Sequence, residues 1–181
     1  MRHQSYTLEC TPDAFKARTS ASGGLVIVRA TTRDAARCGR LWTGVGAGFW
    51  TGRVRWSPAR WVRHLRQPDV SFWIARSAAE TRPDEDVGCF ELIRLVRGTK
   101  IQGFGLLPPS RGRGLGRDLL TAATMQAFAT GARKVWLHTA TDDHPAALPN
   151  YLAGGYRIVR TRELRNPMPA PTPPPGERRV V

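Results

Sequence analysis

Apolar and polar positions alternate over short stretches of this chain and recur at helical spacing over others. The short β-branched or alternating runs, each bounded by turn residues, predict strands at residues 25–28, 70–75, 87–96, 100–107, 134–139 and 156–160. Capping residues and apolar positions three or four apart predict helices at residues 34–42, 58–66, 114–130 and 145–153. The resulting order, β-α-α-β-β-β-α-β-α-β, predicts an α/β (α+β) fold with a mixed sheet of six to seven strands and about four helices.

The two ends of the chain lack this patterning. Residues 1–23 show no periodic apolar positions, and six prolines lie between Pro167 and Pro175. Proline removes backbone donors and favours extended, unpaired chain. We therefore expect an N-terminal extension over 1–23, a single folded domain over 24–165 and a disordered proline-rich tail over 166–181, which suits a chain of 181 residues.

The net charge of +14 indicates an anionic partner of some kind. Only three of the 28 basic residues are lysines. This skew fits either genomic base composition or selection for phosphate and carboxylate recognition. The basic residues form no compact run, so a nucleic-acid partner is not favoured.

Cysteine use and hydropathy indicate the compartment. The three cysteines are far apart and form no CxxC pair, which predicts neither a disulfide framework nor a zinc site. No apolar run has the length of a membrane span, and the N-terminus does not resemble a secretion signal. We expect a soluble, cytoplasmic protein with no membrane partner.

The segment from Ile101 to Leu120 carries the clearest chemical signal. A strand leads into a loop with alternate glycines at 112, 114 and 116 and arginines at 111 and 113, and the loop opens directly into an amphipathic helix. Glycines let a backbone approach a ligand closely, and a helix N-terminus attracts anions. The loop therefore predicts a phosphate or pyrophosphate site, although such a junction can also serve only to close a turn.

Three segments, in the same order and at the same separations, resemble one family. Residues 111–116 (Arg-Gly-Arg-Gly-Leu-Gly) resemble the Arg/Gln-x-x-Gly-x-Gly/Ala signature of the GNAT superfamily of N-acetyltransferases. Residues 104–108 resemble that family's fourth strand, and residues 146–156 resemble its final helix and strand. The resemblance covers about residues 86–160. It implies a GNAT-like fold and an acetyl-CoA-dependent N-acetyltransferase, an acyltransferase that moves an acetyl group to a primary amine, without a metal.

The resemblance also implies which residues bind the co-substrate acetyl-CoA. The pyrophosphate cradle would be the backbone of Arg111, Gly112, Arg113, Gly114, Leu115 and Gly116, with the two arginines as charge partners. Backbone groups of Leu106 and Leu107 would pair with the pantetheine arm. His144 stands where the family often has an asparagine near that arm.

Two residues are candidates for catalysis. By resemblance, Tyr151 would be the general acid that protonates the leaving thiolate, because a phenol is a neutral donor at pH 7. The alternative is an ordinary amphipathic tyrosine on a short helix. Glu91, inside the apolar strand from Cys89 to Ile93, is the candidate base, since burial raises the pKa of a carboxyl group. Its alternative is a strand carboxylate that faces solvent or an arginine.

The segment between the first two predicted strands would shape the acceptor pocket, as in GNAT-like folds. Trp50, Arg53 and Trp56 represent its aromatic and basic residues, which suit a small amine that also carries a carboxylate or phosphate. The alternative is that these tryptophans only pack helices against the sheet. The cluster of His138, Asp142, Asp143 and His144 lacks helical metal-ligand spacing, so we expect no metal and a loop that lines the coenzyme mouth.

Other functions remain open at the level of sequence. The favoured acceptor is the amine of a small molecule. The basic charge also fits acetylation of an aminoacyl-tRNA held along its phosphates, and a protein amine fits too. A non-catalytic acyl-CoA-binding protein would keep the cradle without the chemistry. The chain is expected to be a monomer or a homodimer.

Overall fold

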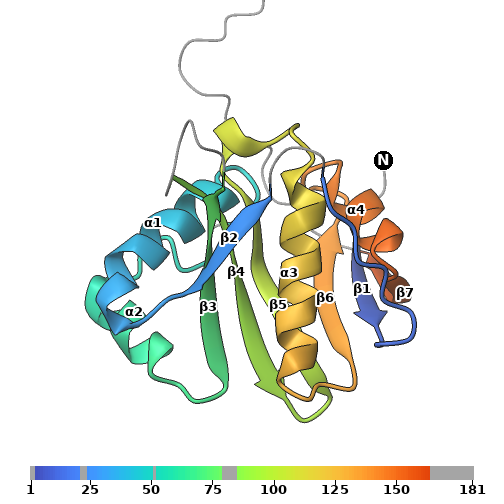
Figure 1. Cartoon of the computed structure of the whole chain (residues 1–181), viewed down its shortest axis with the longest axis horizontal. Coiled ribbons are helices and arrows are strands. Elements are labelled where there is room, and N and C mark those ends of the chain that lie inside the picture. The colour runs from blue at the N-terminus through green and yellow to red at the C-terminus, as the bar shows by residue number, and fades with distance from the viewer. Residues whose placement is uncertain (1–2, 21–23, 51, 79–84, 164–181) are drawn as a thin grey trace, which may run out of the picture.

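The structure, a computed structural model, describes residues 3–20, 24–50, 52–78 and 85–163 (Figure 1). Its strands are β1 (Gln4–Cys10), β2 (Leu25–Arg29), β3 (Val70–Ser77), β4 (Asp86–Leu95), β5 (Gly98–Leu106), β6 (Val135–Ala140) and β7 (Arg157–Glu163). The α-helices are α1 (Ala35–Gly46), α2 (Pro58–Leu65), α3 (Leu115–Ala129) and α4 (Ala147–Ala153), and short 3-10 turns cover Thr32–Asp34 and Pro108–Ser110. From residue 25 onward, the predicted order of elements is confirmed.

The described strands form one seven-stranded mixed sheet in the order β2-β3-β4-β5-β6-β1-β7. Neighbours pair antiparallel except β5 and β6, which are parallel. The parallel pair follows from the crossover through α3, which carries the chain back to the end of the sheet where β5 begins. Residues 108–120 therefore lie at the end of the sheet where β5 stops and α3 starts.

The N-terminal segment corrects the sequence-based boundary. Residues 1–23 were expected to be an extension outside the folded unit, yet Gln4–Cys10 forms β1 between β6 and β7. Leu8 and Cys10 are buried in the core. The following residues run along α3, where the backbone N–H of Arg18 donates to Thr121 Oγ1 at 2.9 Å. The proline-rich tail predicted over 166–181 lies outside the described residues.

Two apolar cores lie on opposite faces of the sheet. On one face, α3 packs Leu115, Leu119 and Ala123 against strand residues such as Phe90, and Figure 1 shows this helix lying across the sheet. On the other face, α1 and α2 pack Trp42 and Trp61 against β3 and β4. Because neighbouring strand residues point to opposite faces, β4 supplies Phe90 to one core and Cys89 to the other.

Capping residues in the sequence explain two helix starts. Thr31 and Asp34 form a capping box ahead of α1. The Ser57 side chain accepts from the backbone N–H of Arg60 at the start of α2, with Pro58 in the first helical position. The first helix was predicted to end at Trp42, but α1 continues through Gly46, where the Trp50 ring packs on the glycine.

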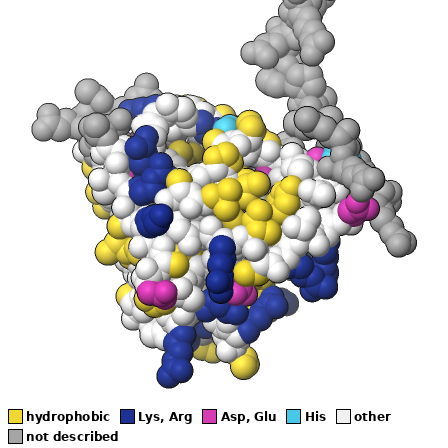
Figure 2. All heavy atoms as spheres, turned by 90° about the vertical axis from the view of Figure 1, so that its right-hand side faces the viewer, with side chains coloured by type: hydrophobic (Ala, Val, Ile, Leu, Met, Phe, Trp, Pro, Cys, Tyr) yellow, Lys and Arg dark blue, Asp and Glu magenta, His cyan; other side chains and the backbone are white. Residues whose placement is uncertain are grey.

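The surface charge is dispersed over the face drawn in Figure 2, where Lys and Arg side chains lie in separate places around a central apolar area. Within the described residues, no helix is both long enough and apolar enough to cross a membrane.

Candidate functional site

A cavity of about 670 Å³ opens where two neighbouring strands separate. β5 and β6 pair only at Thr99 with Val135 and at Lys100 with Trp136, and beyond these pairs the strands diverge. The walls of the gap are residues 100–106 of β5 on one side and Leu137 and His138 of β6 on the other. The opening therefore exposes the backbone edge of β5 to whatever fills the cavity.

A β-bulge in β5 lies beside this opening. Gln102 is opposite Glu91 and Gly105 is opposite Cys89, so two β5 residues face the single residue Phe90. The bulge contains Gly103 in a left-handed conformation with φ of 55°. A Cβ atom at this position would lie 2.1 Å from the Trp42 ring. Only glycine meets both conditions, since it has no side chain and adopts positive φ at no steric cost.

The direction of the backbone groups at the end of β5 follows from one hydrogen bond. The N–H of Leu107 donates to the Val87 carbonyl of β4 at 2.8 Å. Because successive backbone groups of a strand point to opposite sides, the N–H of Leu106 points toward the cavity. Leu107 itself does not line the cavity, and its side chain packs against α1 near Gly44.

The glycine-rich loop brings backbone donors to one end of the cavity. Gly112 and Gly114 have φ of 75° and 79°, and both line the cavity together with Gly116. Gly114 is the N-cap of α3 and supplies no side-chain hydrogen bond to the first turn. The first N–H groups of an uncapped helix lack partners within the helix and attract anions. This geometry suits a phosphate or pyrophosphate.

The arginines near the loop have different surroundings. Arg111 turns inward, and its guanidinium donates to the carbonyls of Leu106 and Val45, each at 3.1 Å. Burial lowers the pKa of Arg111. Arg113 is exposed and does not line the cavity. Arg18 and Arg117 do line it, although the sequence reading singled out neither, and Arg18 lies in the segment that was expected to be an extension.

Tyr151 of α4 is 6% exposed and lines the cavity beside Phe104. Among the described residues, none forms a hydrogen bond with its hydroxyl group, whereas the Tyr156 hydroxyl is paired with Thr124 Oγ1 at 2.7 Å. Burial, followed by the charge of Asp143, raises the pKa of Tyr151 above its ordinary value. The side chain is therefore a neutral phenol with a proton to donate into the cavity.

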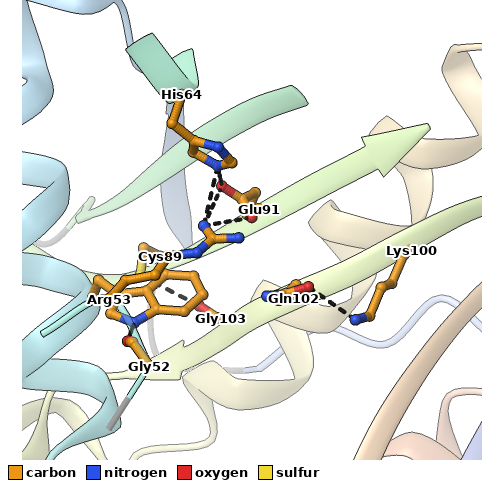
Figure 3. A network of polar contacts seen from close by, with 9 residues as sticks. Gly52, Arg53, His64, Cys89, Glu91, Lys100, Gln102 and Gly103 are labelled. Atoms are coloured by element: carbon orange, nitrogen blue, oxygen red, sulfur yellow. Dashed lines mark hydrogen bonds and ion pairs between the residues drawn. The ribbon is translucent and has the colours of Figure 1, made fainter. Parts of the chain in front are cut away.

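Glu91, the predicted base, is fully buried and does not line the cavity. Both of its oxygens accept from Arg53 Nη1 at 2.9 Å, and Oε1 lies 2.5 Å from His64 Nε2 (Figure 3). The carboxylate thus faces an arginine, which is one of the two alternatives left open by the sequence.

The predicted acceptor residues divide between two places. Trp50 lines the cavity, while Arg53 and Trp56 line a second pocket next to α2. The Arg53 guanidinium lies 4.3 Å from the centre of the Trp42 ring and 4.8 Å from that of Trp56. Its backbone is left-handed, with φ of 66°. The Arg53 side chain is thus held among tryptophans, and these tryptophans pack α1 and α2 against the sheet.

The cluster after β6 does not converge on one point. His138 Nδ1 lies 3.0 Å from Thr7 Oγ1, and Asp142 pairs with His3 at 2.5 Å. Asp143 accepts from Thr139 and from the backbone of Ala140. Within the described part of the chain, no group of three or more His, Cys, Asp or Glu side chains could hold a metal ion. His144, Asp143 and His138 all line the cavity.

Sequence reasoning missed two polar residues at the far end of the cavity. Lys100 and Gln102 line it, and Lys100 Nζ donates to Gln102 Oε1 at 2.9 Å (Figure 3). Burial, then the charges of Arg53 and Arg97, lower the pKa of Lys100. The alternation of side chains along a strand could have placed both residues on one face of β5. No nearby sequence feature indicated that β6 would separate from β5 next to them.

Of the predicted site residues, the cavity is lined by Trp50, Leu106, Arg111, Gly112, Gly114, Gly116, His144 and Tyr151. It is not lined by Arg53, Trp56, Glu91, Leu107, Arg113 or Leu115. The cavity thus joins the glycine-rich loop, the open edge of β5 and Tyr151 in one continuous space.

Comparisons with known proteins identify the family and the fold. The model of the acetyltransferase (GNAT) family matches residues 37–154. The chain is similar to a GCN5-related N-acetyltransferase from Kribbella flavida, with 21% identity, a TM-score of 0.62, and coverage of 88% of this chain and 58% of that one. It is also similar to the spermidine/spermine N-acetyltransferase SpeG of Vibrio cholerae, with 19% identity, a TM-score of 0.57, and coverage of 74% and 78%.

A third similar structure is an aminoglycoside acetyltransferase from an uncultured soil metagenomic sample, with 20% identity, a TM-score of 0.58, and coverage of 81% of this chain and 99% of that one. At such low identity, these likenesses show a common fold. The chain spans between 50% and 60% of the length of the first three structures that it matches. No curated protein sequence matches it.

Proposed function

Because this chain belongs to the GNAT acetyltransferase family, whose members use acetyl-CoA as co-substrate, we propose that it moves the acetyl group of acetyl-CoA to the primary amine of a small molecule. The observation that carries the proposal is the continuous cavity from the uncapped start of α3 to the point where β5 and β6 separate. A long thioester needs such a space, with an anion site at one end and a polar strand edge along its length.

Acetyl-CoA would bind through backbone groups. The N–H groups at the start of α3, with Gly112 and Gly114 in left-handed conformations, suit the pyrophosphate. Arg18 and Arg117, which line this end, would add charge. The pantetheine arm would then follow β5, where the N–H of Leu106 turns toward the cavity. Arg111 would support the site by holding the carbonyls of Leu106 and Val45 in place.

The reaction would proceed by direct attack. The amine nitrogen bonds to the thioester carbon, the carbon–sulfur bond breaks, and the sulfur leaves as a thiolate that takes the proton of the Tyr151 hydroxyl group. Backbone N–H groups on the open edge of β5 would stabilise the oxyanion. The lack of a partner for the Tyr151 hydroxyl among the described residues supports this role, because its proton is free for the thiolate.

The same chemistry assigns a different role to Glu91. Its oxygens are engaged by Arg53 and His64, so it would need to lose an ion pair before it could accept a proton. This supports a positioning role for Glu91, in which it fixes Arg53 and with it the loop that follows α1. The proton lost by the acceptor ammonium would leave through water in the cavity.

The proposal is tested by measuring release of free thiol from acetyl-CoA with a panel of primary amines. We expect amine-dependent release, with equal amounts of acetylated amine found by mass spectrometry. Coenzyme A alone should raise the melting temperature, since a ligand that binds only the folded state stabilises it. Absence of both thiol release and thermal stabilisation by coenzyme A would overturn the enzyme assignment. Stabilisation without release would support a binding protein.

A further inference from the structure

We propose that the end of the cavity farthest from the glycine-rich loop binds an anionic group of the amine acceptor, a carboxylate or a phosphate, through the side chains of Lys100 and Gln102. This inference rests on the proposed function and narrows its substrate class. It replaces the acceptor site expected from Arg53 and Trp56, since both lie outside the cavity.

The position of Lys100 separates it from the phosphates of acetyl-CoA. Lys100 belongs to the last residue pair between β5 and β6, and Leu106 is the last residue of β5. Because of the bulge, the strand advances by only five residue steps between them, from the partner Ile93 to the partner Gly88 on β4, and at about 3.3 Å per step the two lie about 17 Å apart along the strand. The ammonium group is therefore at the opposite end of the cavity from the backbone donors of Gly112 and Gly114 and is left to the acceptor.

Lys100 is a half-buried cation whose partner is neutral. Nζ donates to Gln102 Oε1 at 2.9 Å and lies 5.3 Å from the centre of the Trp136 ring. Within the part of the chain that the structure describes, no carboxylate forms an ion pair with it. Partial burial of a charge is unfavourable unless it is compensated, so an anion in the cavity would supply what the protein does not. The amide nitrogen of Gln102 offers further donors to the same anion.

Most of the charges around the cavity are positive. The Arg97 guanidinium lies 3.7 Å from the centre of the Trp136 ring, which Lys100 also faces, and Glu91 is paired with Arg53. The charged residues that line the cavity are Arg18, Lys100, Arg111, Arg117 and Asp143, and Asp143 already accepts two hydrogen bonds from its own loop. Polyamines and aminoglycosides would be repelled from such a space.

This charge distribution also serves the reaction. A positive field disfavours the ammonium form of a bound amine and so increases the fraction of free amine that can attack the thioester. The acceptor would thus lose its proton without a dedicated carboxylate in the cavity.

The test compares acceptors with and without the anion, with each rate expressed per concentration of free amine. Amino acids are paired with their amides, and phosphoethanolamine with ethanolamine, and kcat/KM is measured by thiol release. We expect the anionic member to be favoured by about tenfold to 100-fold, the effect of one hydrogen bond to a charged group. The first pair tests a carboxylate, and the second tests a phosphate. Equal values in both pairs would overturn the proposal.

Variants connect the preference to the residue. Lys100→Gln should bring the ratio of kcat/KM for each pair close to one, mainly by raising KM for the anionic acceptor. Lys100→Arg should keep most of the preference for the anionic acceptor. Lys134→Gln is the matched control, because Lys134 pairs with Glu9 and does not line the cavity. A preference that survives in Lys100→Gln would overturn the proposal.

Failure of the anion site can be distinguished from failure of the proposed acetyltransferase function. If neutral and anionic amines are acetylated equally, the enzyme assignment stands and the anion site fails. If no amine is acetylated, the enzyme assignment fails. Calorimetric titration of the same amino acids into protein saturated with coenzyme A then decides the anion site. Binding that is lost in Lys100→Gln supports it, and absence of binding overturns it.

Discussion

The two tyrosines near the end of the chain differ in one contact that decides what each can do. Both are buried, but the Tyr156 hydroxyl is paired with Thr124 and the Tyr151 hydroxyl has no partner among the described residues. We predict that Tyr151→Phe lowers kcat about 100-fold with little change in KM, since it removes the proton for the thiolate and keeps the ring. Steady-state thiol release measures both constants.

The matched control for this prediction is Tyr156→Phe. It removes a hydroxyl group that is engaged elsewhere, so kcat should stay near the wild-type value while the free energy of unfolding falls by about 1 kcal/mol. Because burial raises the pKa of Tyr151, the acid stays protonated as the pH rises, and kcat should show no alkaline decline below pH 10. Equal losses of kcat in the two variants would contradict the assigned role.

Arg53 and Glu91 form a buried ion pair that we expect to contribute to stability. Their side chains are 13% and 0% exposed. We predict that Arg53→Met or Glu91→Leu alone lowers the free energy of unfolding by about 3–5 kcal/mol, because each leaves a buried charge without its oppositely charged partner. The double variant should lose much less than the sum. Urea denaturation of the four proteins measures the coupling.

The control pair for this cycle is Lys134 and Glu9, whose side chains are 33% and 22% exposed. Lys134→Met should change the free energy of unfolding by at most about 1 kcal/mol, as expected for an ion pair near solvent. Strictly additive losses for Arg53 and Glu91 would show that the contacts with the tryptophans, rather than the ion pair, hold this loop.

At the scale of the element, the bulge in β5 connects packing to the cavity. Gly103 combines a left-handed backbone with contact to Trp42. We predict that Gly103→Ala lowers the free energy of unfolding by about 2–5 kcal/mol, the sum of about 1–2 kcal/mol for the strained backbone and about 1–3 kcal/mol for overpacking. It should also weaken the binding of coenzyme A. Denaturation and calorimetry measure the two effects.

Gly131 is the matched control for the bulge. It too is left-handed, with φ of 84°, but a Cβ there would have no atom within 4 Å. Gly131→Ala should therefore lower the free energy of unfolding by only about 1–2 kcal/mol, the cost of the strained backbone, and leave coenzyme A binding unchanged. If the two variants are equally stable, the contact with Trp42 does not constrain β5.

Local signals predicted most elements but not the way in which they meet. The Ser57-Pro58 start of α2 and the glycine loop before α3 are encoded within a few residues, and both were found from the sequence. The family resemblance based on that loop is confirmed by the family match. The divergence of β5 from β6 and the pairing of Arg53 with Glu91 depend on residues about 35 or more positions apart. Neither has a local signal, so the end of the cavity at Lys100 and Gln102 and the surroundings of Glu91 could not be predicted from the sequence.

At the scale of the whole molecule, the strand that sequence reasoning missed joins β7 to the rest of the sheet. β1 pairs with β6 on one side and with β7 on the other. Its seven residues alternate weakly, with Leu8 and Cys10 facing the core, and their partners lie more than 120 positions away. A short segment of this kind resembles an irregular terminus when it is read alone. The segment after it then carries Arg18 to the cavity.

The structure therefore predicts that the sequence-based boundary at residue 24 cuts through the fold. A chain that begins at residue 24 loses the strand between β6 and β7 and should show no cooperative thermal transition. A chain that ends at residue 165 should melt as the full chain does, as expected if the proline-rich segment lies outside the domain. Differential scanning calorimetry of the three proteins provides the comparison.

A milder pair of variants tests β1 within the full chain. Leu8→Ala should lower the free energy of unfolding by about 2–5 kcal/mol, because Leu8 is fully buried in the core beneath α3. Its neighbour Thr7 points to the other face and contacts His138 at the surface, so Thr7→Ala should cost at most about 1 kcal/mol. Two results together would contradict this role of β1. Leu8→Ala would be as stable as Thr7→Ala, and the chain from residue 24 would melt cooperatively and still bind coenzyme A. The sheet would then fold without β1.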